Sequence, residues 1–292
     1  MFEFDDAWLA LRAPADSAAR ADYLVSHLGS LHAGQGGLRV LDLGCGTGAN
    51  LRHLAPLLAE AGHAHQRWTC VDHDPALLAR LPARLRDWAE AGELECRGAR
   101  GGLDIRAGGW CAEVAWERAD LAAEVQRLAL PAGGLVTASA LLDLVSEHWL
   151  ATLLRRCRAA RCALLFALTY DGRCGLAPAH PDDARVIALV NRHQGGDKGF
   201  GPALGPAAPA AAGHRCGALG YRVRAAPSDW QIGPPMAGLQ RALLAGWRDA
   251  AVAMSETGTT AWLDHWHAAH LASIAAGTLR LDVGHMDLLA LP

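Results

Sequence analysis

The sequence predicts an α/β protein built on one doubly wound, mostly parallel sheet. Short apolar runs alternate with longer segments of helical spacing along the first 170 residues. The first clear run breaks into a cluster of glycines that opens a helix, a device found at the ligand-binding edge of such sheets. Of 292 residues, 51% are hydrophobic and 20% charged, which provides a large core and excludes intrinsic disorder. We therefore expect one domain over residues 1–292.

Each element is predicted from its spacing and its boundary residues. Apolar residues at helical spacing predict one helix over 5–28 that ends at Gly29. Short apolar runs bounded by turn residues predict strands over 38–43, 67–72, 135–139, 163–169, 221–225 and 278–289. The third strand is expected at 93–96 or at 112–118, and the sequence leaves both open. Helices are predicted from the glycine cluster to residue 60, over 74–90, over 147–158 and along 236–276.

The predicted elements group into a core with attached segments. Residues 1–35 form an N-terminal helical segment, and 36–170 form a cofactor-binding core. After the fifth strand the alternation fails, so 171–220 is expected to be a loop-rich insertion, with a loop or hinge over 201–213. Residues 236–277 form a second, helical insertion between the last two strands. We expect the two insertions to cap a substrate.

Composition and charge exclude several classes of protein. The net charge of −3 gives no positive field to attract nucleic acid or an anionic membrane. No apolar run approaches the roughly 20 residues of a membrane span, and the acidic start argues against a signal peptide. Eight scattered cysteines without a Cys-x-x-Cys pair indicate reduced thiols and a cytoplasmic location. His265, His267 and His270 lack the glutamate of an H-E-x-x-H site, so no metal is expected.

The most informative segment is Val40-Leu-Asp-Leu-Gly-Cys-Gly-Thr-Gly48. Its acidic residue, Asp42, suits a cationic ligand with an amine and a sulfonium, and it sits badly beside a pyrophosphate. Gly44, Gly46 and Ala49 nevertheless also satisfy the dinucleotide fingerprint. A second carboxylate, Asp72, ends the next predicted strand, where it can accept hydrogen bonds from both ribose hydroxyls.

These two features resemble motif I and the ribose-binding acid of class I S-adenosylmethionine-dependent methyltransferases. The resemblance implies a Rossmann-like fold whose last strand is reversed, here matched by 281–290, with insertions after strand 5 and between the last two strands. It implies S-adenosylmethionine as cofactor. The residues that it assigns to cofactor binding are Asp42, Gly44, Gly46, Gly48, Asp72, His73, Asp120, Leu121 and Ser139.

Polar residues after the fourth and fifth strands are candidates for the acceptor side. Asp143, Asn191 and Lys198 are predicted to bind the substrate, and His193 or Tyr170 is the candidate general base. The polar, glycine-rich segment 191–200 is predicted to form a mobile cap over the acceptor. Structural alternatives remain open: a helix cap for the carboxylates at 120 and 143, and a solvated loop for 191–200.

The predicted activity is methyl transfer from S-adenosylmethionine to a small molecule of bacterial secondary or cofactor metabolism. We expect no nucleic-acid or membrane partner, because there is no basic stripe and no Asn/Asp-Pro-Pro-Tyr/Phe motif after the fourth strand. The alternatives are an NAD(P)-dependent oxidoreductase and a non-catalytic S-adenosylmethionine-binding protein. The sequence does not indicate the acceptor or the oligomeric state.

Overall fold

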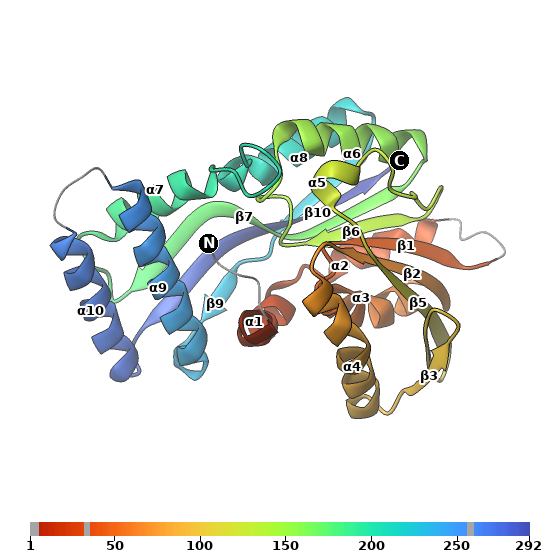
Figure 1. Cartoon of the computed structure of the whole chain (residues 1–292), viewed down its shortest axis with the longest axis horizontal. Coiled ribbons are helices and arrows are strands. Elements are labelled where there is room, and N and C mark those ends of the chain that lie inside the picture. The colour runs from red at the N-terminus through yellow and green to blue at the C-terminus, as the bar shows by residue number, and fades with distance from the viewer. Residues whose placement is uncertain (1–5, 32–35, 256–259) are drawn as a thin grey trace.

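A computed structural model describes residues 6–31, 36–255 and 260–292. These residues form a ten-stranded sheet of order β3-β4-β5-β2-β1-β6-β7-β10-β8, and β9 pairs with β10 beside that path (Figure 1). The strands are β1 (Leu38–Leu43), β2 (His65–Asp72), β3 (Glu95–Ala99), β4 (Gly102–Ala107), β5 (Trp110–Arg118), β6 (Leu135–Ser139), β7 (Ala163–Ala177), β8 (Arg222–Pro227), β9 (Trp230–Ile232) and β10 (Arg280–Leu291).

The strand order confirms the predicted fold class. Strands β5, β2, β1, β6 and β7 are parallel neighbours, which is the 3-2-1-4-5 order of a doubly wound sheet. Strand β10 pairs antiparallel with both β7 and β8, so the last strand is reversed as expected. The carboxyl ends of the parallel strands therefore share one edge, where ligands bind in such sheets.

Helices cover both faces of the sheet and surround one end of it (Figure 1). On one face lie α2 (Tyr23–Ser26), α3 (Ala49–Glu60) and α4 (Pro75–Ala91), and on the other α5 (Leu121–Glu124), α6 (Glu147–Ala159) and α8 (Ala208–Ala218). Three helices gather near the far ends of β7 and β10: α7 (Asp183–Gln194), α9 (Ala237–Met254) and α10 (Ala261–Ala275). Helix α1 (Asp6–Ala19) lies between them and the helices of the core. Single turns of 3₁₀-helix occur at His27–Ser30, Gly205–Ala207 and Pro234–Met236.

The two candidates for the third strand both form strands, with different roles. Residues 110–118 form β5, which lies parallel to β2 and is the third strand of the core. Residues 95–99 form β3, an edge strand that pairs antiparallel with β4. Strand β4 and the short β9 were not predicted, because neither stands out as an apolar run.

The single helix predicted over 5–28 is wrong, because the chain breaks between α1 and α2. The backbone N–H of Ala21 donates to Asp287 Oδ2 at 3.0 Å, and Arg20 Nε lies 3.6 Å from the same oxygen. Asp287 Oδ1 accepts from the Leu168 N–H at 2.7 Å. One buried carboxylate on β10 thus holds the N-terminal segment against β7, at the cost of helical continuity.

An insertion follows the fifth strand as predicted, but the loop-rich character expected over 171–220 is wrong. Strand β7 continues to Ala177, α7 follows, and most of the hinge candidate 201–213 lies in the 3₁₀ turn and in α8. The side chains of Ala208, Ala212 and Cys216 are buried on the inner side of α8. Small residues on every side of this helix give no amphipathic pattern, which explains why it was not predicted.

Strands β7 and β10 extend well beyond the edge of the core sheet. Ser139, the last residue of β6, pairs with Ala167, whereas β7 runs on to Ala177 beside β10. The extension is packed against α7, α9 and α10 and carries its own apolar cluster, which includes Trp230, Trp247 and Trp266. The carboxyl edge of the core sheet therefore lies where the extension of β7 and β10 begins.

Candidate functional site

The glycine loop joins β1 to α3 with its backbone turned into conformations that favour glycine. Gly44, Gly46 and Gly48 have φ values of 66°, 52° and 81°. The N–H groups of Gly44 and Cys45 donate to the Val71 carbonyl at 2.9 and 3.1 Å, which fixes the loop against β2. A Cβ on Gly46 would lie 3.4 Å from the side chain of Leu9 in α1, so α1 packs over this loop.

Asp72 ends β2 directly beside the glycine loop. Its Oδ2 accepts from the Gly46 N–H at 2.8 Å, and its Oδ1 accepts from the Asp74 N–H at 3.0 Å. The carboxylate is 5% exposed, whereas the neighbouring His73 side chain is exposed. The structure therefore brings together the loop and the strand-end acid that the sequence predicted as one site.

Asp42 lies at the end of β1 and is fully buried. Its Oδ1 accepts from Asn50 Nδ2 at 2.7 Å, and Asn50 is in turn held by Arg20 Nη1 at 3.1 Å. Its Oδ2 has no hydrogen-bond partner among the described residues. Burial raises the pKa of Asp42 to about 7, against the opposing effects of Asn50 and Arg20. The roles of Asn50 and Arg20 were not predicted, because only the fold brings them to this carboxylate.

The remaining cofactor candidates occupy the same edge of the sheet. Asp120 caps α5, since its Oδ1 accepts from the Ala122 N–H at 2.9 Å and from the Ala123 N–H at 3.3 Å. The carbonyl of Leu121 accepts from Trp149 Nε1 at 2.6 Å. Ser139 is half-buried at the end of β6. The helix-cap alternative for Asp120 is therefore present in the structure, and its adenine role stays a prediction.

Asp143 follows β6 and is the acidic group on the acceptor side. Its side chain is buried, and its Oδ1 has no hydrogen-bond partner in the described part of the chain. Burial raises its pKa to about 6, and the charges of Arg12 and Lys198 oppose that rise. Its backbone carbonyl accepts from the Gly205 N–H at 2.9 Å, so the segment after α7 is docked on this loop.

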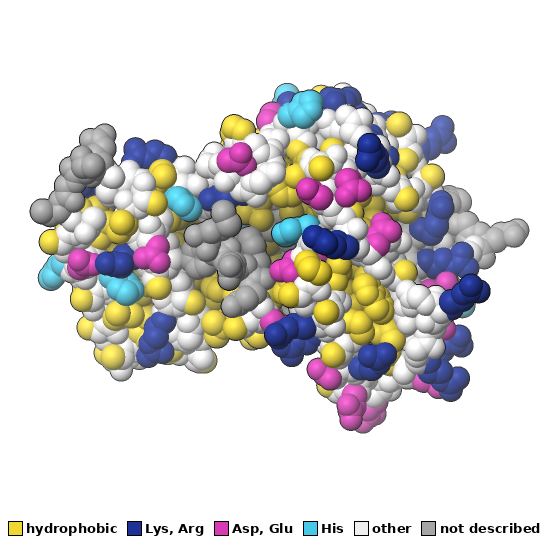
Figure 2. Space-filling view, in the orientation of Figure 1, with side chains coloured by type: hydrophobic (Ala, Val, Ile, Leu, Met, Phe, Trp, Pro, Cys, Tyr) yellow, Lys and Arg dark blue, Asp and Glu magenta, His cyan; other side chains and the backbone are white. Residues whose placement is uncertain are grey.

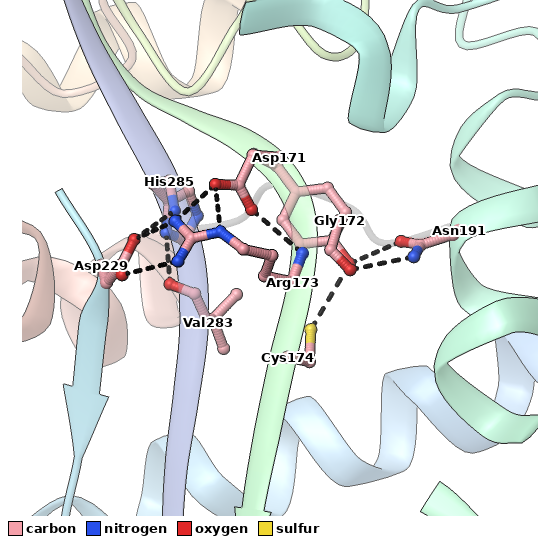
Figure 3. Close-up of polar contacts among 9 residues, drawn as sticks. Asp171, Gly172, Arg173, Cys174, Asn191, Asp229, Val283 and His285 are labelled. Carbon is pink, nitrogen blue, oxygen red and sulfur yellow. Dashed lines mark hydrogen bonds and ion pairs between the residues drawn. The ribbon is translucent and has the colours of Figure 1, made fainter. Parts of the chain in front are cut away.

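Tyr170 and Asn191 bind one another. The Tyr170 hydroxyl donates to Asn191 Oδ1 at 2.7 Å, and Asn191 Nδ2 donates to the Gly172 carbonyl at 2.9 Å (Figure 3). Burial raises the pKa of Tyr170 well above its ordinary value of 10. A hydroxyl that donates to an amide oxygen and resists ionisation is poorly placed to act as a base. The geometry does not support the predicted catalytic role of Tyr170, and the substrate role of Asn191 stays a prediction.

His193 and Lys198 lie at the end of α7 and just after it. The predicted loop 191–200 thus begins inside a helix, since α7 ends at Gln194. Lys198 Nζ donates to the His193 carbonyl at 3.2 Å. Burial lowers the pKa of both side chains, and the charge of Lys198 lowers that of His193 further. Their catalytic and substrate roles stay predictions.

A charged cluster from β7 and the approach to β9 borders His285 of β10 (Figure 3). The Arg173 guanidinium bridges Asp171 and Asp229, at 2.6 and 2.8 Å from Nη2. The backbone N–H of His285 donates to Asp229 Oδ1 at 3.0 Å. Burial lowers the pKa of His285 to about 4. The position of His285 could not be predicted from the sequence, because its partners come from distant parts of the chain.

The histidines of α10 belong to a structural network. His270 Nε2 lies 2.8 Å from Asp183 Oδ1, and Trp266 Nε1 donates to the same oxygen at 2.8 Å. Among the described residues, no group of three or more His, Cys, Asp or Glu side chains could hold a metal ion. A separate cavity of about 240 Å³ lies near α8 and is lined mainly by apolar side chains, which gives it no chemistry of its own.

Acidic and basic side chains are both spread across the face seen in Figure 2, and neither kind dominates it. No helix in the described ranges is long and apolar enough to span a membrane.

Solved structures of S-adenosylmethionine-dependent methyltransferases are similar to the chain over almost its whole length. A cyclopropane synthase, MmaA2, of Mycobacterium tuberculosis is 12% identical with a TM-score of 0.49, over 98% of this chain and 94% of its own. An S-adenosylmethionine-dependent methyltransferase of Thiobacillus denitrificans, bound to S-adenosylhomocysteine, is 13% identical with a TM-score of 0.43 over 100% of both chains. A phosphoethanolamine N-methyltransferase of Haemonchus contortus is 13% identical with a TM-score of 0.41, over 100% of this chain and 59% of its own.

No protein-family model matches the sequence, and no curated protein matches it significantly. At such low identities the likeness is one of chain topology, and it says nothing about the acceptor.

Proposed function

We propose that the chain transfers a methyl group from S-adenosylmethionine to a small-molecule acceptor. The observation that carries this proposal is the buried Asp42 carboxylate, whose Oδ2 has no donor among the described residues. A buried acceptor without a donor is costly, so the site favours a ligand that brings one. The ammonium group of S-adenosylmethionine supplies such a donor and its sulfonium adds positive charge, whereas the pyrophosphate of a dinucleotide would add negative charge.

The chain's own residues fit the rest of this cofactor. The glycine loop offers backbone without side chains, and the N-terminus of α3 follows it directly. Asp72 holds that loop through Gly46 and keeps acceptor capacity on both oxygens for the two ribose hydroxyls. When bound, S-adenosylmethionine supplies an electrophilic methyl group on sulfur. The protein's task is then to orient the acceptor and exclude water.

The reversed strand β10 argues against the NAD(P)-dependent alternative. A dinucleotide-binding sheet continues with a sixth parallel strand and a second nucleotide-binding half. Here the antiparallel strand β10 stands beside β7 instead, and α7, α9 and α10 pack against the extension of these two strands. The remaining alternative is a protein that binds S-adenosylmethionine without catalysis, and an activity measurement distinguishes it from an enzyme.

Calorimetric titration tests the proposal directly. We expect the protein to bind S-adenosylhomocysteine and not NAD. Gly46→Val should abolish this binding, because it adds a branched side chain at φ 52° against Leu9. Gly98→Val is the matched control, since a Cβ at Gly98 meets nothing within 4 Å. Binding of NAD instead, or normal binding by folded Gly46→Val, would contradict the assignment. Release of labelled methyl to an acceptor separates an enzyme from a mere binding protein.

A further inference from the structure

The imidazole of His285 is held in one tautomer. Its Nδ1 lies 3.0 Å from the Val283 carbonyl oxygen, which can only accept a hydrogen bond. Nδ1 therefore carries the hydrogen, and Nε2 carries the lone pair. Within the described ranges, Nε2 makes no hydrogen bond, so the ring has a free acceptor atom.

His285 lies close to Tyr170 and Asp143, two of the residues predicted for the acceptor side. It pairs with Tyr170 across β10 and β7, and the two rings are 6.0 Å apart. The Tyr170 backbone amide interacts with the Asp143 carboxylate, which places Asp143 next to this pair. Arg12 of α1 acts electrostatically on both His285 and Asp143. One turn earlier in α1, Leu9 packs over Gly46 of the glycine loop, so α1 spans from the donor side to His285.

The surroundings keep this imidazole neutral. The indole of Trp230 packs against it at 4.9 Å, and Arg12 lies over that indole at 5.0 Å. Two carboxylates face the ring, Asp171 from β7 and Asp229 from the approach to β9, and Arg173 binds both. Burial and the Arg12 charge outweigh them and lower the pKa of His285. The lone pair on Nε2 is therefore available at neutral pH.

We propose that His285 takes up the proton that the acceptor loses during methyl transfer. It follows that the acceptor is a small molecule whose nucleophilic atom bears a hydrogen, such as a hydroxyl or an amine. This inference rests on the proposed function and concerns the side of the proposed site where the acceptor binds. His285 then has the general-base role that was predicted for His193 or Tyr170.

The step balances without any further reactant. A lone pair on the acceptor atom forms the new bond to the methyl carbon, and the carbon–sulfur bond breaks with its electrons left on sulfur. The acceptor's hydrogen passes to His285 Nε2 as a proton, which leaves a neutral methylated product, S-adenosylhomocysteine and an imidazolium. The Asp171 and Asp229 carboxylates, which face the ring, stabilise that imidazolium until the proton reaches water.

The test uses His285→Asn in the full-length protein, because an asparagine amide can still donate to the Val283 carbonyl but offers no basic nitrogen. The control is His63→Asn, which replaces a buried histidine bonded to the Leu28 carbonyl before β2. Three readouts are needed: calorimetry with S-adenosylhomocysteine, ¹⁵N NMR of labelled histidines, and methyl transfer to phenol.

We expect S-adenosylhomocysteine to bind wild type and both variants equally. The NMR signal lost in His285→Asn should be that of a neutral imidazole protonated on Nδ1 between about pH 6 and pH 8. With S-adenosylhomocysteine bound, phenol should shift its Nε2 resonance, and anisole, which lacks the proton, should not. Methyl transfer to phenol should fall about 100-fold or more in His285→Asn and stay unchanged in His63→Asn.

Three results would each overturn the role of His285: an imidazole protonated on Nε2, an Nε2 resonance that does not shift when phenol is added, and undiminished methyl transfer by His285→Asn. Failure of wild type to bind S-adenosylhomocysteine would instead refute the proposed function, so the two failures are distinguishable.

Discussion

Asp42→Asn should stabilise the protein at alkaline pH while weakening donor binding. In the wild type, burial raises the pKa of Asp42 from 3.8 to about 7. At about 1.4 kcal/mol for each pH unit, ionising this carboxyl in the folded state costs ~4 kcal/mol. Asparagine carries no charge, but its amide nitrogen would take the unpartnered position and cost about 1–3 kcal/mol. The variant should therefore be more stable than wild type at pH 8 by roughly 1–3 kcal/mol.

The sign of the pH dependence gives the sharper test. A carboxyl with a raised folded pKa binds its proton more tightly in the folded state, so it destabilises the protein increasingly as pH rises from about 4 to 7. Lowering the pH from 8 to 5 should then stabilise wild type relative to Asp42→Asn by about 2–3 kcal/mol. Urea unfolding followed by tryptophan fluorescence at both pH values measures this difference.

The control for this comparison is Asp104→Asn, which changes a half-buried carboxylate on β4 that makes no hydrogen bond with the described residues. It should show no such pH-dependent difference. If the stability gap between wild type and Asp42→Asn is the same at pH 5 and pH 8, Asp42 is not a destabilised buried acid. The reasoning that it awaits a cationic ligand would then fall.

Three further substitutions test the neighbouring assignments. Asp72→Asn should weaken the binding of S-adenosylhomocysteine by about 1–3 kcal/mol in calorimetry, because it disturbs both the proposed ribose contact and the hydrogen bond to Gly46. Unchanged affinity in a folded variant would reject the ribose assignment. Asp120→Ala should cost about 1 kcal/mol of stability through the lost cap of α5, measured by thermal unfolding, and an additional loss of donor affinity would establish its adenine role. Lys198→Ala should lower kcat/KM for the acceptor while leaving donor affinity intact, and wild-type kinetics would place this lysine outside the site.

The core of the fold could be predicted from sequence because its determinants are local. Strand β6 has the predicted bounds, and α4 begins at Pro75 after the Asp74 cap. The glycine loop and Asp72 were predicted together for the same reason, since each ends its own strand. Helix α8 was missed because alanine on all its faces hides the inner one.

The acceptor side could not be predicted because its contacts join distant parts of the chain. Nothing near His285 in sequence indicates that Tyr170 is its partner across the sheet. Nothing near Arg12 indicates that its charge acts on both His285 and Asp143. Such groups become visible only when strand register is known, since period-two alternation fixes a strand's faces but not its neighbour.

The Asp287 carboxylate, which binds Ala21 across 266 positions of sequence, has a consequence for synthesis on the ribosome. The residues proposed to hold the donor emerge early, since β1 to β6 precede residue 140. His285, and the Asp287 carboxylate that binds the segment between α1 and α2, emerge only with the last strand. We therefore expect a nascent chain to be able to hold S-adenosylmethionine well before it can turn the cofactor over.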